Sequence, residues 1–104
     1  MKDTFTYLVF MNGENLVKIG RTKDLVSRIR QIKTANPMVT NINYYDGNIE
    51  NLLHRIFKDC RYIREWFDYS DFGYNNFMNI VESIVDIRLK SNSDCEAYSK
   101  IFKL

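Results

Sequence analysis

Strand-like hydrophobic segments dominate the first half of the chain. Residues 4–11 are β-branched and aromatic, which predicts a strand, and Asn12-Gly13 is a strong hairpin signal because both residues tolerate positive φ angles. Residues 15–20 are then expected to return as a second, antiparallel strand. A third strand is predicted over residues 39–45, which are rich in Val, Ile, Thr and Tyr and precede a turn at residues 46–48.

Three segments carry the hydrophobic repeat of an amphipathic helix. They are residues 24–34, 49–60 and 75–90, and Asn36-Pro37 ends the first because proline cannot donate a backbone hydrogen bond. The apolar faces consist of Leu25, Ile29 and Ile32, of Ile49, Leu52, Leu53, Ile56 and Phe57, and of Phe77, Ile80, Val81, Ile84 and Val85. Thr22 or Asp24 can cap the first helix, and Ser93-Asp94-Cys95-Glu96 is typical of a capping box that opens a short fourth helix.

The expected order of elements is β-β-α-β-α-α-α. This order predicts an α/β fold of the α+β kind, in which a small three-stranded antiparallel sheet is flanked by helices. The 104 residues are the size of one domain and 45% of them are hydrophobic, so residues 1–104 are expected to form a single domain with a core. No apolar run is long enough to span a membrane, so no membrane partner is expected.

Charge is distributed unevenly along the chain, although the net charge is only +2. Six basic residues and one acidic residue lie between positions 18 and 33, and four basic residues lie between positions 55 and 64. Residues 69–104 carry four basic and five acidic side chains, so the positive charge lies in the first two thirds, where a polyanion could bind. Solvated helix faces explain the same charges about equally well.

The cysteines indicate a reducing environment. Cys60 and Cys95 have neither a zinc spacing nor the pattern of a disulfide framework. The short apolar stretch at Tyr7–Met11 is not followed by a signal cleavage site. We therefore expect a cytoplasmic or nuclear protein, in the host cell if it is viral, that is not secreted.

Tyr7 is the first candidate for chemistry. Along the predicted first strand Phe5, Tyr7 and Val9 share one face, and the hairpin should bring Lys18 near Tyr7. A neighbouring ammonium group lowers the pKa of a tyrosine, which would make Tyr7 a general base. The more common roles of such residues are a core aromatic for Tyr7 and a solvent-facing lysine for Lys18.

Arg28, Glu65 and His54 are further candidates. Arg28 lies off the apolar face of its helix, and arginine binds phosphate in a planar, bidentate way. Glu65 stands beside two large aromatic residues, and a single carboxylate of this kind suits Mg²⁺. The ordinary alternatives are a solvated arginine, a salt bridge from Glu65 to Arg61 or Arg64, and a surface or core histidine.

Together these residues resemble the motifs of the GIY-YIG endonuclease superfamily. Tyr7 is separated by ten residues from Lys18-Ile19-Gly20, and Arg28 follows Lys18 by ten positions, which resembles the spacing of the two motifs and the arginine of that family. The run from Lys18, together with residues 53–58 and Glu65-Trp66-Phe67, is similar to a phage and virus branch whose second motif begins with Lys. The resemblance covers residues 4–68, and helices within residues 75–104 would complete the fold.

The resemblance implies a metal-dependent DNA endonuclease, which is a hydrolase of phosphodiester bonds with Mg²⁺ or Mn²⁺ as cofactor and DNA as partner. Tyr7 would be the general base, Arg28 would neutralise the phosphate and Glu65 would hold the metal ion. Lys18 and His54 would complete the catalytic set. Contacts to flanking phosphates are expected from the basic residues Arg21, Lys23, Arg30, Lys33, Arg55, Lys58 and Arg61.

Some positions depart from that family pattern. Phe5 and Thr6 replace a glycine and an isoleucine of the first motif, Lys18 replaces a tyrosine, and Arg64 stands where a glycine is expected. The family also places an asparagine near its last helix, where this chain offers three candidates. They are Asn75, Asn76 and Asn79.

Two other functions stay open. One is a DNA-binding module of the same fold that does not cut, and the other is a small viral or phage interaction domain that uses helix 75–90. Its apolar contacts would come from Phe72, Tyr74, Phe77 and Phe102, for which burial in the core is the more common role. A homodimer or a larger viral or phage complex stays open as well, as do the preferred DNA and the biological process.

Overall fold

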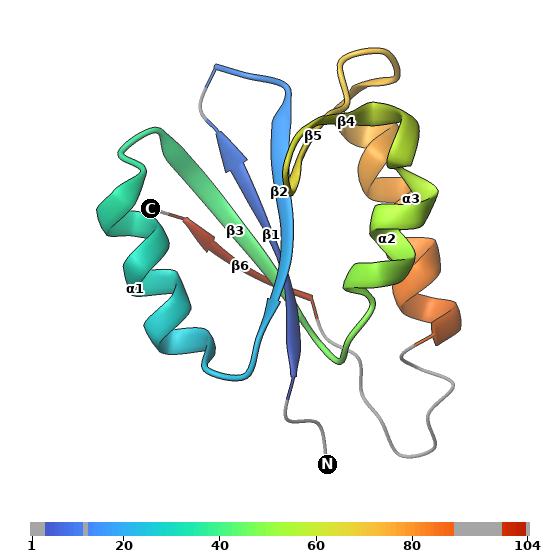
Figure 1. The fold of residues 1–104 in the computed structure, drawn as a ribbon. Coiled ribbons are helices and arrows are strands. Elements are labelled where there is room, and N and C mark those ends of the chain that lie inside the picture. The colour runs from blue at the N-terminus through green and yellow to red at the C-terminus, as the bar shows by residue number, and fades with distance from the viewer. Residues whose placement is uncertain (1–3, 12, 89–98, 104) are drawn as a thin grey trace.

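A six-stranded antiparallel sheet forms the centre of the structure, a computed structural model that describes residues 4–11, 13–88 and 99–103. The strands are β1 (Phe5–Met11), β2 (Leu16–Thr22), β3 (Val39–Asp46), β4 (Arg61–Ile63), β5 (Trp66–Asp68) and β6 (Ser99–Lys103). Their spatial order is β4-β5-β2-β1-β3-β6. The helices are α1 (Leu25–Ala35), α2 (Glu50–Ile56) and α3 (Gly73–Arg88), and a 3₁₀ turn, η1 (Lys58–Cys60), follows α2. Helix α1 lies on one face of the sheet, and α2 and α3 lie on the other (Figure 1).

The mixed α+β fold class is confirmed, but the sheet is larger than the three strands predicted. Strands β1, β2 and β3 match the predicted segments, whereas β4 and β5 extend the sheet beside β2 and β6 extends it beside β3. Strands β4 and β5 have three residues each, which is too short for a hydrophobic alternation to appear in the sequence. The observed order of elements is therefore β-β-α-β-α-β-β-α-β.

The C-terminal segment also differs from the prediction. The expected capping box at residues 93–96 lies outside the described residues. Residues 99–103, which were assigned to the helical C-terminal part, form β6 and pair with residues 41–45 of β3. This pairing satisfies the backbone groups of β3 along a whole strand, whereas one capping interaction contributes only about 1 kcal/mol to a short helix.

The three remaining helices lie near their predicted ranges. Helix α1 begins directly after Asp24, whose carboxylate accepts a hydrogen bond from the Ser27 amide at 3.1 Å. Helix α2 ends at Ile56 instead of residue 60, because the chain tightens into η1 before it enters β4. Helix α3 begins at Gly73, two residues before the predicted start.

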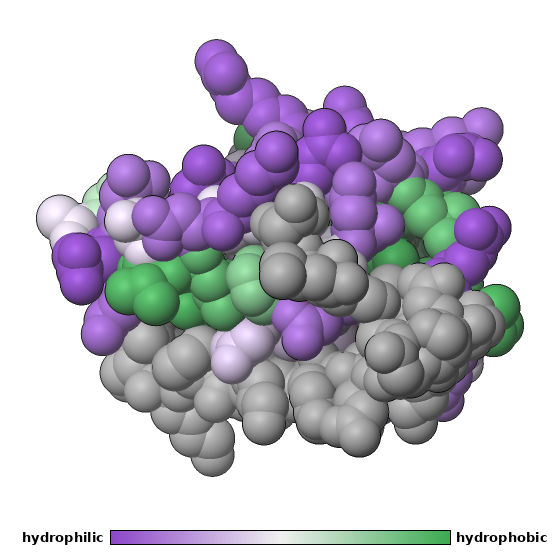
Figure 2. All heavy atoms as spheres, turned by 90° about the horizontal axis from the view of Figure 1, so that it is seen from below, coloured by the Kyte–Doolittle hydropathy of each residue, from purple (hydrophilic) through white to green (hydrophobic). Residues whose placement is uncertain are grey.

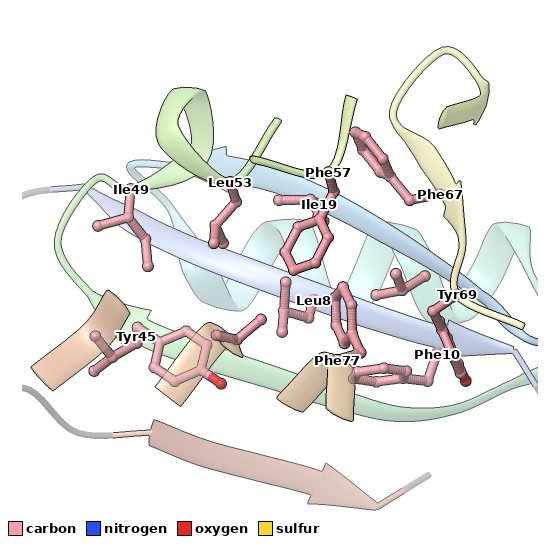
Figure 3. Packing of buried hydrophobic residues seen from close by; sticks show 13 residues of the cluster. Leu8, Phe10, Ile19, Tyr45, Ile49, Leu53, Phe57, Phe67, Tyr69 and Phe77 are labelled. Atoms are coloured by element: carbon pink, nitrogen blue, oxygen red, sulfur yellow. The ribbon is translucent and has the colours of Figure 1, made fainter. Parts of the chain in front are cut away.

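Alternation along β1 divides the core into two parts. Leu8 and Phe10 point towards α2 and α3, while Tyr7 and Val9 point towards α1, so the predicted two faces of this strand are confirmed. The larger part is rich in aromatic rings, and Figure 3 shows Phe57 of the α2 end above Phe77 of α3, with ring centroids 4.7 Å apart. Most of the apolar stripe of α3 is therefore buried within the chain, namely Phe77, Val81 and Val85, whereas Ile80 of the predicted stripe is exposed.

Candidate functional site

The candidate residues gather around a free segment of strand β2. Strand β5 pairs with residues 16–18 of β2, and the Ile19 amide donates a last hydrogen bond to the Glu65 carbonyl at 3.1 Å. Beyond it, residues 20–22 still pair with β1, but among the described residues no strand lies on their other side. Side chains from both faces of the sheet meet around this free segment.

Tyr7 crosses from β1 over Gly20 of β2. The two residues are directly opposite each other, and a Cβ atom at position 20 would lie 2.5 Å from both Cζ and the hydroxyl oxygen of Tyr7. Only glycine leaves room for the ring, because every other residue would place a Cβ atom inside it. The spacing of Tyr7 and Gly20 in the sequence thus reflects a direct contact.

The Tyr7 hydroxyl group is bound by Arg28 of α1. Arg28 Nη1 donates a hydrogen bond to the hydroxyl oxygen at 3.0 Å. Arg28 lies in the first turns of α1, where Asp24 is the N-cap and the Asp24 amide in turn donates to the Thr22 hydroxyl group at 3.0 Å. The capped start of the helix therefore fixes the backbone that carries Arg28.

The pKa of Tyr7 is raised above its ordinary value. Burial is the main cause, and the hydrogen bond and charge of Arg28 offset only part of it. The negative charges of Glu65 and Glu50 raise the pKa further. Lys18 lies opposite Val9 and is not among the charges that act on Tyr7, so the predicted lowering of the pKa by Lys18 is wrong.

An open pocket of about 430 Å³ lies beside Arg28. Three of its lining residues are cations that come from β2, from the loop after it and from α1. The pocket is lined by Thr4, Arg21, Thr22, Lys23, Arg28 and Asn48. Figure 2 views the molecule from the end where the β2–α1 and β3–α2 loops lie, and hydrophilic side chains cover much of it. Converging guanidinium and ammonium groups of this kind suit an oxyanion such as a phosphate.

Glu50, which the sequence analysis did not single out, supports this pocket from the α2 face. Its buried carboxylate places Oε1 3.4 Å from Nε of Arg21 and Oε2 3.7 Å from Nε2 of His54. The buried Thr6 hydroxyl group holds the preceding loop, since it donates to the Gly47 carbonyl at 2.8 Å and accepts from the Ile49 amide at 2.9 Å. The only signal in the sequence was an acidic residue within an apolar helix repeat.

The ring of His54 is held in place by contacts with the Ile19 backbone and with Arg61. Its Nε2 lies 2.8 Å from the Ile19 carbonyl oxygen, which can only accept, so Nε2 carries a proton. Nη2 of Arg61 lies 3.3 Å from Nδ1. The ring also packs edge-on against Phe67, with centroids 5.0 Å apart. These contacts bring His54 to Ile19 and Glu50 and not to Tyr7.

Glu65 lies at the turn between β4 and β5, on the far side of the free segment. Its half-buried side chain lines a second pocket of about 300 Å³, together with Lys18, Arg64 and Trp66. None of the described residues forms an ion pair with its carboxylate, so the alternative of a salt bridge to Arg61 or Arg64 is not observed.

Glu65 supplies the one carboxylate among the residues that line this second pocket, and the other charged side chains there are the cations Lys18 and Arg64. Mg²⁺ is usually bound by one or two carboxylates, with water and substrate phosphate as the other ligands. In the described part of the chain, no group of three or more His, Cys, Asp or Glu side chains is close enough to hold a metal by itself. Glu65 would therefore hold such an ion together with its substrate.

Arg64 has a left-handed backbone, with a φ angle of 53°. It is the only non-glycine residue with positive φ in the described ranges. The tight turn from β4 to β5 requires this conformation, in which glycine is favoured. The geometry explains why glycine is expected at this position, and Arg64 adds a cation at the cost of backbone strain.

The other predicted contact residues do not form one continuous surface. Arg30 and Lys33 are exposed on α1, whereas Arg55 and Lys58 are exposed on α2 and η1, and these helices cover opposite faces of the sheet. Arg61 binds His54 and lies over the Phe67 ring at 5.5 Å. The three candidate asparagines of α3 line neither of the two pockets; they are Asn75, Asn76 and Asn79.

Comparison with known proteins gives the family. No helix among the described residues has the length and apolar character needed to cross a membrane. No curated protein and no solved structure matches the chain. A family model of the T5orf172 domain, a phage-associated domain related to nuclease folds of the GIY-YIG kind, matches residues 4–90. Because this match includes most of the chain and all of the candidate site, the chain belongs to the T5orf172 domain family.

Proposed function

We propose that this protein is a metal-dependent DNA endonuclease of the GIY-YIG type. The observation that carries the proposal is the hydrogen bond of 3.0 Å between Arg28 and the Tyr7 hydroxyl group, beside a pocket lined by three cations. A tyrosine oxygen beside a pocket lined by three cations is an arrangement that can serve phosphodiester hydrolysis, because the cations can bind the phosphate while the oxygen takes a proton. The family match supports a phage-type nuclease-like or DNA-binding module at the coarser level.

The cations would bind the scissile phosphate before the reaction. Arg28 and Arg21 can donate to its non-bridging oxygens and neutralise the charge that develops on them in the transition state. Glu50 holds Arg21 through its contact of 3.4 Å, so one of these donors is oriented before the substrate arrives. Lys23 would add a third positive charge at the same pocket.

Tyr7 would act as the general base. Its phenolate takes a proton from the attacking water, the water oxygen forms a bond to phosphorus, and the bond to the leaving 3′ oxygen breaks. The raised pKa means that Tyr7 is neutral in the free protein at neutral pH, so the phenolate form is scarce there. Arg28 is the group that favours the phenolate, because its guanidinium already binds the oxygen.

Glu65 would hold the Mg²⁺ or Mn²⁺ ion, which when bound supplies a Lewis acid for the developing negative charge on the leaving oxygen. Lys18 and Arg64 line the same pocket and would bind the strand next to the scissile phosphate. His54 would have a positioning role, since it ties α2 to the Ile19 backbone beside the site. A phage or virus protein of this kind would act where DNA is present, in the cytoplasm or the nucleus of the host.

A DNA-binding module without catalysis is the second candidate. The raised pKa of Tyr7 favours this function, because a protein that only binds DNA does not need the phenolate form of Tyr7. The same cationic pocket would then hold a phosphate that is never hydrolysed. The two functions differ in one outcome, which is whether DNA is cut.

Relaxation of supercoiled plasmid tests the proposal. Wild-type protein should nick the plasmid with Mg²⁺ or Mn²⁺ and not with a chelator, and Glu65→Ala should lose this activity. Glu14→Ala is the matched control, because Glu14 is an exposed glutamate in the β1–β2 turn. A folded protein that shifts DNA in a gel but leaves the plasmid intact with every metal would establish the binding module instead.

A further inference from the structure

An apolar pocket of about 260 Å³ adjoins the Glu65 site. It lies between the β4–β5 hairpin, the start of β2 and the end of α1. Its lining residues are Met11, Leu16, Asn36, Tyr62, Ile63 and Trp66. Trp66 lines both this pocket and the pocket of Lys18, Arg64 and Glu65, so the two are neighbours.

Two of the lining side chains are exposed to an unusual degree for their type. Tyr62 is 67% exposed and Ile63 is 54% exposed, although both belong to a strand of the sheet. Trp66 is partly buried and packs against the core on the α1 side. The pocket thus has one aromatic ring, Trp66, that packs against the core and a second, Tyr62, that is exposed to solvent.

We propose that this pocket holds an unpaired nucleobase of the DNA strand that is cut. The inference rests on the proposed function and specifies its substrate class. Aromatic rings beside a cationic groove are the usual means by which proteins bind single strands, because bases stack on the rings while the phosphates meet the cations. Here Tyr62 and Trp66 would supply the rings. Lys18 and Arg64 would supply the cations that bind a neighbouring phosphate of the DNA strand.

The size and polarity of the pocket favour a base over a protein segment. Its volume of about 260 Å³ is just below the range of about 300–1,000 Å³ for small-molecule sites, which leaves room for one flat ring system. The polar group at its border is the amide of Asn36, whose Nδ2 donates to the Ile32 carbonyl at 3.4 Å and whose Oδ1 can accept a hydrogen bond from a base edge. A base within a regular duplex is stacked between its neighbours and cannot enter, so the substrate would carry an unpaired nucleotide.

Binding of three fluorescent DNAs in the presence of a chelator tests this assignment. They are a duplex with one unpaired adenine, the same duplex with an abasic site in place of that adenine, and a fully paired duplex. Wild-type protein should bind the unpaired adenine about tenfold more tightly than the abasic DNA, since the two differ only in the stacking base. Tyr62→Ala should abolish this difference without loss of thermal stability, because Tyr62 is exposed.

Tyr74→Ala is the control, because Tyr74 is an exposed tyrosine on α3, across the sheet from α1. It should keep the preference for the unpaired adenine. Equal affinity of wild-type protein for the adenine and abasic DNAs would overturn the base pocket while leaving DNA binding and cleavage intact. No binding to any of the three DNAs would contradict the proposed function itself. A dimer that Tyr62→Ala converts to a monomer, with DNA binding unchanged, would show that a second copy occupies the pocket.

Discussion

At the scale of single residues, the site depends on one missing side chain. Gly20 leaves the space through which Tyr7 crosses β2, and the crossing brings the hydroxyl group to Arg28. Tyr7 of the first motif and Gly20 of the second motif are therefore in direct contact. Arg28 could be predicted as a site residue from spacing, but its hydrogen bond to Tyr7 could not, because it depends on where α1 packs.

Gly20→Ala should damage both stability and the site. The new Cβ would lie 2.5 Å from the Tyr7 ring, so the ring must move. Overpacking of this kind lowers the free energy of unfolding by about 1–3 kcal/mol, which denaturant unfolding would measure. In a Tyr7→Ala background the same substitution should cost much less, because the ring is gone. A Gly20→Ala protein as stable as wild type would contradict the crossing.

The residue-level errors of the sequence analysis have physical causes. Lys18 shares a face with Tyr7, but the register places it opposite Val9, two residues away, because the loop between the paired residues Phe10 and Val17 is longer than a two-residue turn. Glu50 was missed because a lone acidic residue in a helix usually faces solvent. Its burial beside Arg21 and His54 arises from contacts between segments that are distant in sequence.

At the scale of elements, the β4–β5 hairpin does most to shape the site. It ends the pairing with β2 at Ile19, carries Glu65 and exposes Tyr62. Helices α1, α2 and α3 were predictable to within a few residues because their hydrophobic repeats are long. Strands β1 to β3 were predictable because they are rich in β-branched and aromatic residues. The hairpin was not predictable, since its strands have three residues each and its turn lacks a glycine.

Arg64→Gly should separate stability from function in that hairpin. The left-handed backbone at φ 53° costs a non-glycine residue about 1–2 kcal/mol of folding free energy, and glycine removes this cost. Part of the gain is offset because glycine also gives the unfolded chain more conformational freedom. Thermal unfolding should therefore show a variant at least as stable as wild type. Its DNA affinity should fall and depend less steeply on salt, because one cation is removed. A clear drop in melting temperature would show that the turn does not require glycine-like geometry.

At the scale of the whole molecule, buried tyrosines couple stability to alkaline pH. Burial raises the pKa of Tyr7, Tyr45 and Tyr69 above the ordinary value of about 10, and Glu82 raises that of Tyr45 further. Above that value the unfolded chain has released protons that the folded protein still holds, so rising pH favours unfolding. The stabilisation is fully present below about pH 10 and is lost as the pH rises through the raised values.

Denaturant unfolding over a pH series checks this expectation. The free energy of unfolding should be steady at neutral and mildly alkaline pH and should fall steeply above about pH 10. Tyr45→Phe should flatten the fall, since the pKa of this residue is raised most strongly. If the free energy of unfolding of Tyr45→Phe falls with pH in parallel with that of the wild-type protein, Tyr45 is not a cause of the alkaline loss of stability.

The central claim is that the Tyr7 hydroxyl group takes part in hydrolysis of DNA. The most direct test is the rate at which Tyr7→Phe relaxes supercoiled plasmid with Mg²⁺, because phenylalanine keeps the ring over Gly20 and removes only the oxygen. We predict a rate at least about a hundredfold below wild type, with DNA affinity retained and the free energy of unfolding within about 1.5 kcal/mol. Relaxation at the wild-type rate would contradict the account.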